Sequence, residues 1–115
     1  MTDQYLHQNA ELPQCPVETT LEVISTRWGA LIVRDLLNGP LRYKELQRSL
    51  GDISQKVLTE NLRQLEARGI LTRTVYEQVP PRVEYKLTEL GQSMRALFDA
   101  LWAWGEHYQE AVAQS

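Results

Sequence analysis

Apolar residues in the middle of the chain repeat first at helical spacing and then at strand spacing. Over residues 54–68, Leu58, Leu62 and Leu65 fall on one side of a 3.6-residue wheel, so only this side is offered to a core. Gly69 is placed to end the helix with a left-handed cap. Because the other side of the wheel is polar, we predict an amphipathic helix with a free polar face.

Residues 72–88 alternate between apolar and polar positions on both sides of a break at 79–82. The break reads Val-Pro-Pro-Arg. Because proline cannot donate a backbone hydrogen bond to a sheet, we expect the tip of a hairpin here, with Arg82 carried outward on it. A polar helix face beside a basic hairpin tip is typical of a winged helix, which can place a helix in the major groove of DNA and a loop along its backbone.

Three further helices are predicted before this segment. Cys15 and Pro16 open the first, since proline is favoured at the first helical position and Cys15 would be the cap. Residues 26–37 are apolar nearly all round, which indicates a central helix. Residues 43–50 form a short helix that makes a helix-turn-helix with the recognition helix at 54–68. The apolar stripe of the first helix is Val17, Leu21 and Ile24.

A last helix is predicted from a cap at Thr88 to about Ala113. Its apolar arc is wider than one contact needs, and an apolar second side at a chain terminus indicates a homodimer interface. The stripe expected to pack on the domain comprises Leu90, Leu97, Leu101, Trp104 and Tyr108. The predicted dimer interface comprises Met94, Phe98, Leu101 and Trp102.

The length of 115 residues suits one domain, so we predict a mainly α fold with a small β-hairpin. Its parts are a flexible N-terminal arm at 1–13, a winged helix-turn-helix domain at 14–88 and a C-terminal dimerisation helix at 89–115. The sequence lacks a membrane-spanning run and a signal-peptide pattern, so a cytoplasmic protein without a membrane partner is expected. One cysteine excludes an internal disulfide, no metal or cofactor cluster is visible, and no catalytic constellation suggests an enzyme.

The net charge of −3 is informative only when it is divided along the chain. Residues 42–86 contain nine basic and six acidic residues, whereas the remainder contains three basic and nine acidic ones. Phosphate contacts need local and not global positive charge, so the division is compatible with nucleic-acid binding. By itself an excess of three charges is within the scatter of ordinary surfaces.

Two sets of residues are candidates for DNA contact. In the first turns of the recognition helix, glutamine can pair with adenine and lysine with guanine, while Ser54 would also cap the helix. Glu60 could accept from cytosine or repel phosphate, and Tyr43 could donate to a phosphate or be a core residue that shows its edge. The predicted base-reading set is Ser54, Gln55, Lys56, Thr59, Glu60 and Arg63. The predicted phosphate-binding set is Arg42, Tyr43, Lys44, Arg73 and Arg82, although each alone could be an ordinary surface residue.

Four segments carry a family resemblance: CPVETTLEVISTRWGALIVRDLL, LRYKELQRSL, ISQKVLTENLRQLEARGIL and PPRVEYKLTELG. In this order they resemble the HxlR family of bacterial winged helix-turn-helix transcription regulators, and the resemblance covers roughly Cys15 to Tyr108. The resemblance implies a homodimer that binds inverted-repeat operator DNA near a promoter. It also implies that the recognition helix starts at 53–56 and that the wing includes 80–83.

The resemblance also concerns Cys15, because some family members sense electrophiles or oxidants through a cysteine just before a proline near the N-terminus. A thiol at a helix N-terminus meets the positive end of the helix dipole, which favours the thiolate, while Glu18 in the first turn opposes this. If Cys15 is exposed, it could form an intersubunit or mixed disulfide. If it is buried, it is a small inert hydrophobe.

The leading prediction is therefore a dimeric DNA-binding regulator, with repression expected. One alternative is a winged helix that is used only for protein contacts. Lys56, Arg63 and Arg82 argue against it, and Glu60 argues mildly for it. Another is a regulator controlled by an aromatic effector instead of a thiol. The effector would bind near Trp28, Trp102 and Trp104, although aromatic residues at helical spacing are more often core or interface.

Overall fold

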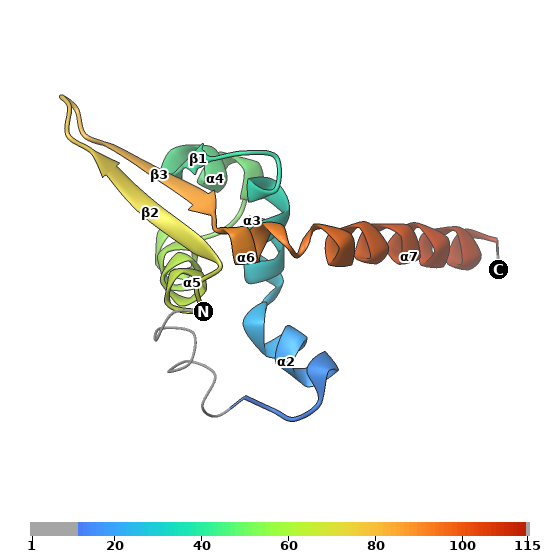
Figure 1. Ribbon diagram of the computed structural model, residues 1–115. Coiled ribbons are helices and arrows are strands. Elements are labelled where there is room, and N and C mark those ends of the chain that lie inside the picture. Colours follow the sequence, from blue (N-terminus) through green and yellow to red (C-terminus); the bar gives the residue numbers. More distant parts are fainter. Residues whose placement is uncertain (1–11, 115) are drawn as a thin grey trace.

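The structure, a computed structural model, describes residues 12–114 and confirms the mainly α winged helix-turn-helix fold (Figure 1). The predicted arm at 1–13 lies almost wholly outside the described residues. Along the chain the elements are α2 (Pro16–Val23), α3 (Arg27–Leu36), β1 (Leu41–Arg42), α4 (Tyr43–Leu50), α5 (Gln55–Ala67), β2 (Leu71–Tyr76), β3 (Arg82–Leu87), α6 (Glu89–Gln92) and α7 (Arg95–Ala113). None of the helices within 12–114 combines the length and apolar character that crossing a bilayer requires.

The core lies where α3, α4 and α5 pack together under the base of the sheet. The predicted inward face of α5 is confirmed, since Leu58, Leu62 and Leu65 are all buried, and Gly69 ends the helix region with a positive φ of 77°. Helix α3 supplies the centre, with Ile32 and Leu36 fully buried. The helix-turn-helix pair α4 and α5 is therefore held on α3 by apolar burial, the main favourable term in folding.

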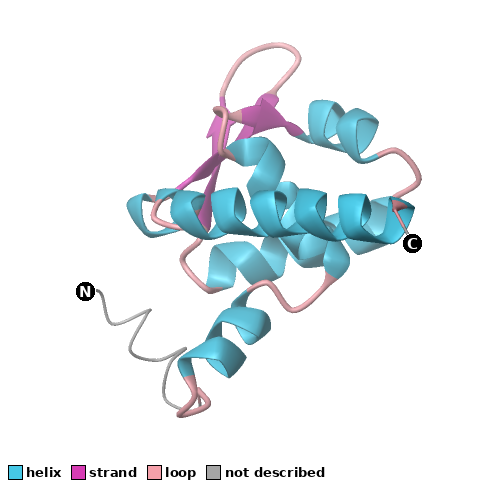
Figure 2. Cartoon of the chain, turned by 90° about the vertical axis from the view of Figure 1, so that its right-hand side faces the viewer, coloured by secondary structure: helices cyan, strands magenta, loops and turns pink. Residues whose placement is uncertain are grey.

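The sheet has three antiparallel strands in the order β1-β3-β2. The predicted hairpin is confirmed. Its strands span residues 71–76 and 82–87, so each begins and ends one residue earlier than the predicted alternation at 72–77 and 83–88. Strand β1 was not predicted, and it pairs Leu41 with Tyr85 and Arg42 with Glu84. This pairing joins the start of α4 to the hairpin. The hairpin and α2 lie at opposite ends of the domain, as the two views show (Figures 1 and 2).

The predicted single helix from Thr88 to Ala113 is wrong, because the chain turns between α6 and α7. The cap itself is confirmed, since the Thr88 hydroxyl accepts from the Gly91 amide at 3.0 Å. The Ser93 hydroxyl then donates to the Leu90 carbonyl, a local bond that competes with helix continuation. Arg95 donates to the Leu37 carbonyl at the end of α3 and so fixes where α7 starts.

Helix α7 extends away from the rest of the domain (Figure 1), which overturns the packing predicted for its stripe. Leu101, Trp104 and Tyr108 are 48%, 64% and 55% exposed instead of packed on the domain. Met94 and Phe98, predicted as interface residues, are partly buried against this chain's own core. On α2, Val17 and Leu21 of the predicted apolar stripe are also exposed. The predicted apolar stripes of α2 and α7 are therefore largely uncovered. The exposed apolar residues of α2, α6 and α7 are Val17, Leu21, Leu90, Leu101, Trp102, Trp104, Tyr108 and Val112.

Candidate nucleic-acid interface

The polar face of α5 begins at a well-formed helix N-terminus. The Ser54 oxygen accepts a hydrogen bond from the Val57 amide at 3.1 Å, which confirms the predicted cap and leaves the hydroxyl proton unused by it. Four of the predicted base-reading side chains are exposed on α5, and Thr59 is half-buried. The exposed four are Gln55, Lys56, Glu60 and Arg63.

Asn61 holds the middle of α5 in place, and sequence reasoning missed it. Only 7% exposed, it accepts from the Thr26 hydroxyl at 2.6 Å and donates to the Val57 carbonyl at 2.8 Å. Thr26 in turn caps α3 by accepting from the Gly29 amide at 2.9 Å. A polar residue next to Leu62, on the apolar side of the wheel, was the available signal, since a buried amide normally has partners.

Arg68 ties the C-terminal end of α5 to α2. Its guanidinium donates to the Val23 carbonyl at 3.0 Å and to the Ser25 hydroxyl at 3.3 Å, both at the C-terminal end of α2. The sequence identified Arg68 only as one positive charge among several. In the structure it joins the helix that begins at Cys15 to the helix that carries the candidate base-reading residues.

Tyr43 lies between α4 and α5, and the structure does not support the predicted phosphate contact of its hydroxyl. That hydroxyl is 3.1 Å from the Gln55 carbonyl and 3.2 Å from the Thr59 hydroxyl. A carbonyl can only accept, so the single phenolic proton goes to Gln55, and Thr59 donates its own proton to Tyr43. A phosphate oxygen also needs a donor, and Tyr43 has no second proton to give.

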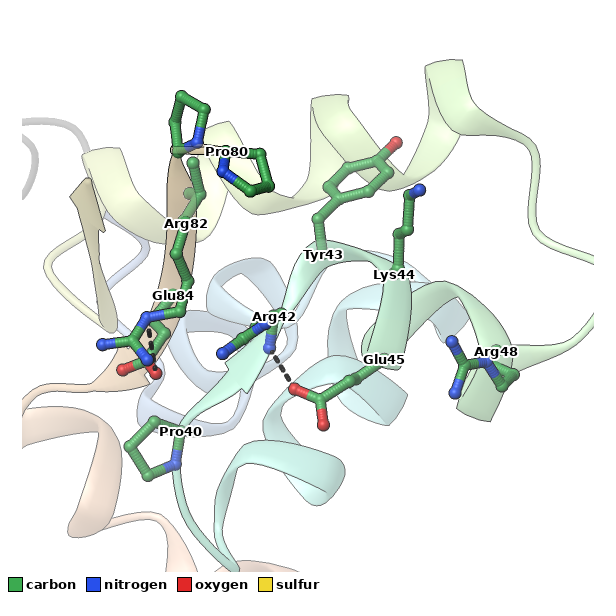
Figure 3. Close-up of a pocket in the computed structure, with 11 residues that line it drawn as sticks. Pro40, Arg42, Tyr43, Lys44, Glu45, Arg48, Pro80, Arg82 and Glu84 are labelled. Carbon is green, nitrogen blue, oxygen red and sulfur yellow. Dashed lines mark hydrogen bonds and ion pairs between the residues drawn. The ribbon is translucent and has the colours of Figure 1, made fainter. Parts of the chain in front are cut away.

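A groove, which we call the wing groove, runs between the start of α4 and the wing (Figure 3). It has a volume of about 860 Å³. Its charged lining residues are Arg42, Lys44, Arg48 and Arg82 together with Glu45 and Glu84. The Glu45 carboxylate accepts from the Arg42 amide at 2.8 Å and thereby caps α4. Four cations against two anions leave a positive groove that suits a phosphate backbone.

Arg82 does not point outward from the hairpin tip as predicted. It is the first residue of β3, and its side chain is only 30% exposed. The guanidinium lies over the Tyr76 ring, 4.3 Å from its centroid, and its Nε is 3.6 Å from the Glu84 carboxylate. The β2–β3 register places Tyr76 opposite Arg82, so the cross-strand pair holds the cation in the wing groove.

A second groove of about 380 Å³ separates α5 from β2. Arg63 and Arg73 line it from opposite elements, and Thr59 and Glu66 contribute to the same wall. The structure therefore brings two of the predicted DNA-binding arginines together beside the base-reading turn.

Cys15 is exposed, as a thiol-reactive role requires. It is the N-cap residue of α2, as predicted, although its side chain makes no capping hydrogen bond. Of the three tryptophans considered for an aromatic effector, Trp28 packs partly against the core and Trp102 and Trp104 are exposed on α7, where Trp104 stacks on Tyr108 at 5.3 Å.

Comparison with known proteins decides the family. The model of the HxlR-like helix-turn-helix family matches residues 23–113, most of the chain. The chain belongs to the HxlR family. It is 47% identical over 96 residues to the uncharacterized HTH-type transcriptional regulator YkvN of Bacillus subtilis (strain 168), with 84% of this chain and 81% of YkvN covered.

Two solved structures resemble this HxlR-family protein closely. The crystal structure of ytcD, described as an HTH-type transcriptional regulator, has a TM-score of 0.80 at 46% identity and covers 84% of this chain and 99% of its own. The redox regulator HypR in its reduced form has a TM-score of 0.82 at 40% identity and covers 88% and 100%. HypR has also been solved in its oxidised form. The prediction of a helix-turn-helix transcriptional regulator instead of an enzyme is therefore confirmed.

Proposed function

We propose that the protein is a homodimeric repressor that binds an inverted-repeat operator and is released from it by oxidants acting on Cys15. The observation that carries DNA binding is the position of α5 relative to the two grooves. Tyr43 of the wing groove contacts Gln55 and Thr59 of α5. Thr59 and Arg63 of α5 line the second groove together with Arg73. Gln55 and Lys56 would reach base edges, since side chains early in a recognition helix do so in this motif. Ser54, Thr59 and Glu60 complete the base-facing set.

Cations on both sides of α5 would hold the DNA backbone in register. Arg42, Lys44 and Arg82 lie on the wing side, and Arg63 and Arg73 lie on the other. Such contacts fix the orientation of the helix but carry no sequence information, whereas the α5 face supplies it. Two copies with recognition helices about 34 Å apart would meet successive major grooves of a palindrome.

Support for the dimer comes from the uncovered apolar side chains of α7 and α2. Leu101 and Trp102 are exposed, and Met94 and Phe98 continue this face onto the core of the domain. In addition, a Cβ built on Gly105 meets nothing within 4 Å. A glycine within a 19-residue helix costs roughly 1 kcal/mol relative to alanine. Close approach of a helix from a second copy would account for a glycine at this position.

Control by oxidants is supported by the exposure of Cys15 and by the similarity to HypR, a redox regulator solved in two redox forms. Since the chain has one cysteine, a disulfide must involve another molecule: Cys15 of a second copy or a small thiol. Two thiols would each lose a proton and an electron to the oxidant as the sulfur–sulfur bond forms. The disulfide would form at the N-terminal end of α2 and could displace this helix, which Arg68 joins to α5.

A DNA-binding titration tests the proposal. Purified protein, Cys15→Ser and Lys56→Ala would be titrated onto DNA from upstream of its own and the neighbouring gene, in several salt concentrations and with or without diamide. Arg34→Ala is the control, because Arg34 is paired with Asp35 at 2.8 Å and lines neither groove. We expect salt-sensitive binding that Lys56→Ala weakens and Arg34→Ala does not. Diamide should release every protein that keeps Cys15 and leave Cys15→Ser bound.

Other outcomes separate the parts of the proposal. Binding that ignores diamide in both the wild type and Cys15→Ser would reject the thiol switch and favour a different signal, such as an aromatic effector. Absence of specific binding to either DNA would favour a winged helix used for protein contacts. Sedimentation velocity of Gly105→Ala tests the dimer: we expect weaker association than in the wild type, and an unchanged or tighter dimer would contradict close helix approach at this position.

A further inference from the structure

We infer that Tyr43 is a positioning residue for base recognition: it sets the first turn of α5 without touching DNA. The inference rests on the proposed operator binding. Tyr43 is the first residue of α4, and its ring packs partly against the core while its hydroxyl reaches α5. Figure 3 shows the side chain directed from α4 toward the ribbon of the following helix.

The Tyr43 hydroxyl makes two hydrogen bonds, which hold two consecutive turns of the recognition helix. The donated bond, 3.1 Å long, ends at the carbonyl of Gln55, the first residue of α5. The accepted bond, 3.2 Å long, comes from Thr59, one turn later on the same face. Carbonyls of a helix have a second lone pair beyond the intrahelical bond, so the contact with Gln55 does not compete with the helix.

The consequence for Thr59 is chemical as well as geometric. While its proton is donated to Tyr43, Thr59 cannot donate to a base edge, so it can only accept or make an apolar contact. Its χ1 angle is also restricted, because both the β-branched side chain and the hydrogen bond favour particular rotamers. Loss of the Tyr43 hydroxyl would release this proton and loosen the turn that carries Gln55 and Lys56.

Tyr43→Phe is the central variant because it keeps the packed ring and removes only the oxygen. Thr59→Val removes the partner hydroxyl at nearly constant shape, and the double variant completes a cycle. The matched control is Ser49→Ala, which also removes one hydroxyl of α4. The Ser49 hydroxyl donates to Asp35 of α3 at 2.7 Å and does not bond α5.

The measurements are affinities for the operator, for operators with single-base changes and for unrelated DNA, together with the melting temperature. We expect Tyr43→Phe to lower operator affinity by about 5- to 10-fold, at the low end of the usual effect of the two hydrogen bonds that it breaks, and to reduce discrimination among the base variants. Affinity for unrelated DNA stays unchanged. The loss of operator affinity in the double variant is smaller than the sum of the two single losses, because both changes break one shared contact. Ser49→Ala binds like the wild type.

Three results would overturn the inference. Equal losses on operator and unrelated DNA would mean that Tyr43 contacts the backbone directly. A lower melting temperature with wild-type affinity and discrimination would mean a structural role only, and additive effects in the double variant would mean independent actions. The proposed function is tested separately, since its failure appears as a wild type that does not distinguish the operator from unrelated DNA.

Discussion

Gly91 of α6 packs closely against Ile70 and Leu87 at the end of the sheet, so Gly91→Ala tests whether this close contact stabilises the fold. A Cβ at this position would lie 2.2 Å from the Ile70 carbonyl oxygen and 3.2 Å from the Cβ of Leu87. The obstructing oxygen belongs to the backbone and accepts a hydrogen bond from the Thr88 amide at 2.9 Å. It also shares the single proton of the Thr88 hydroxyl, 3.1 Å away, with the Gly69 carbonyl at 2.6 Å. To reach an ordinary contact distance, α6 must retreat by about 1 Å.

The cost can be estimated from these contacts. Overpacking costs roughly 1–3 kcal/mol, and weakening one or both Thr88 bonds adds roughly 1 kcal/mol each. Alanine is favoured over glycine within a helix by about 1 kcal/mol, which offsets part of the loss. We therefore expect Gly91→Ala to lower the free energy of unfolding by about 1–4 kcal/mol and the melting temperature by about 5–15 °C. Because α6 leads directly into α7, association should weaken as well.

Thermal unfolding followed by circular dichroism, at one protein concentration for all variants, measures the effect. Sedimentation velocity at a temperature where both proteins are folded measures the association. A melting temperature within 2 °C of the wild type would refute the reasoning, because it would mean that α6 relaxes away from Ile70 without losing its bonds.

Two other substitutions test single contacts. Arg82→Gln should weaken binding to operator and unrelated DNA by similar factors and reduce the salt slope by about one unit; a loss confined to the operator would instead mean that Arg82 reads bases. Arg68→Ala removes the bonds to Val23 and Ser25, so the free energy of unfolding should fall by about 1–2 kcal/mol. In the same variant, hydrogen exchange should accelerate at the end of α2 and not in α4, and uniform acceleration would contradict the assigned contact.

Elements with a strong local pattern were predictable. Helix α5 has a serine cap, one apolar face and a terminal glycine, and these local signals agree with its burial in the structure. Strand β1 could not be found in this way, because two residues carry no periodicity and their pairing depends on residues 84–85, about 40 positions later. The end of α6 was missed for a similar reason. Helix α6 ends because of tertiary contacts, namely the packing of Gly91 against Ile70 and the hydrogen bond from Arg95 to Leu37. The apolar pattern itself continues through this point of the sequence.

The candidate site shows the same division between local and tertiary information. Residue type and helix face were enough to select the exposed α5 residues and Arg42 and Lys44 of the wing groove, but Arg48 of the same groove was missed. The orientation of Arg82 required the register that places Tyr76 across from it. The role of Tyr43 required the distance between two helices, which no spacing within one helix reveals. Asn61 also needed its partner Thr26, 35 positions earlier in the chain.

The tethers of α5 make its tilt dependent on its neighbours. Its first turn is held to α4 by Tyr43, whereas its last residue is followed by Arg68, which is held to α2. Thirteen residues at 1.5 Å each span about 20 Å, so a 2 Å displacement of α2 against α4 would rotate the helix axis by about 5°. Helix α5 would then pivot about its first turn, where Tyr43 holds Gln55. Under the proposed function, a disulfide at Cys15 would therefore alter the angle at which α5 meets the bases without any change in the residues that meet them.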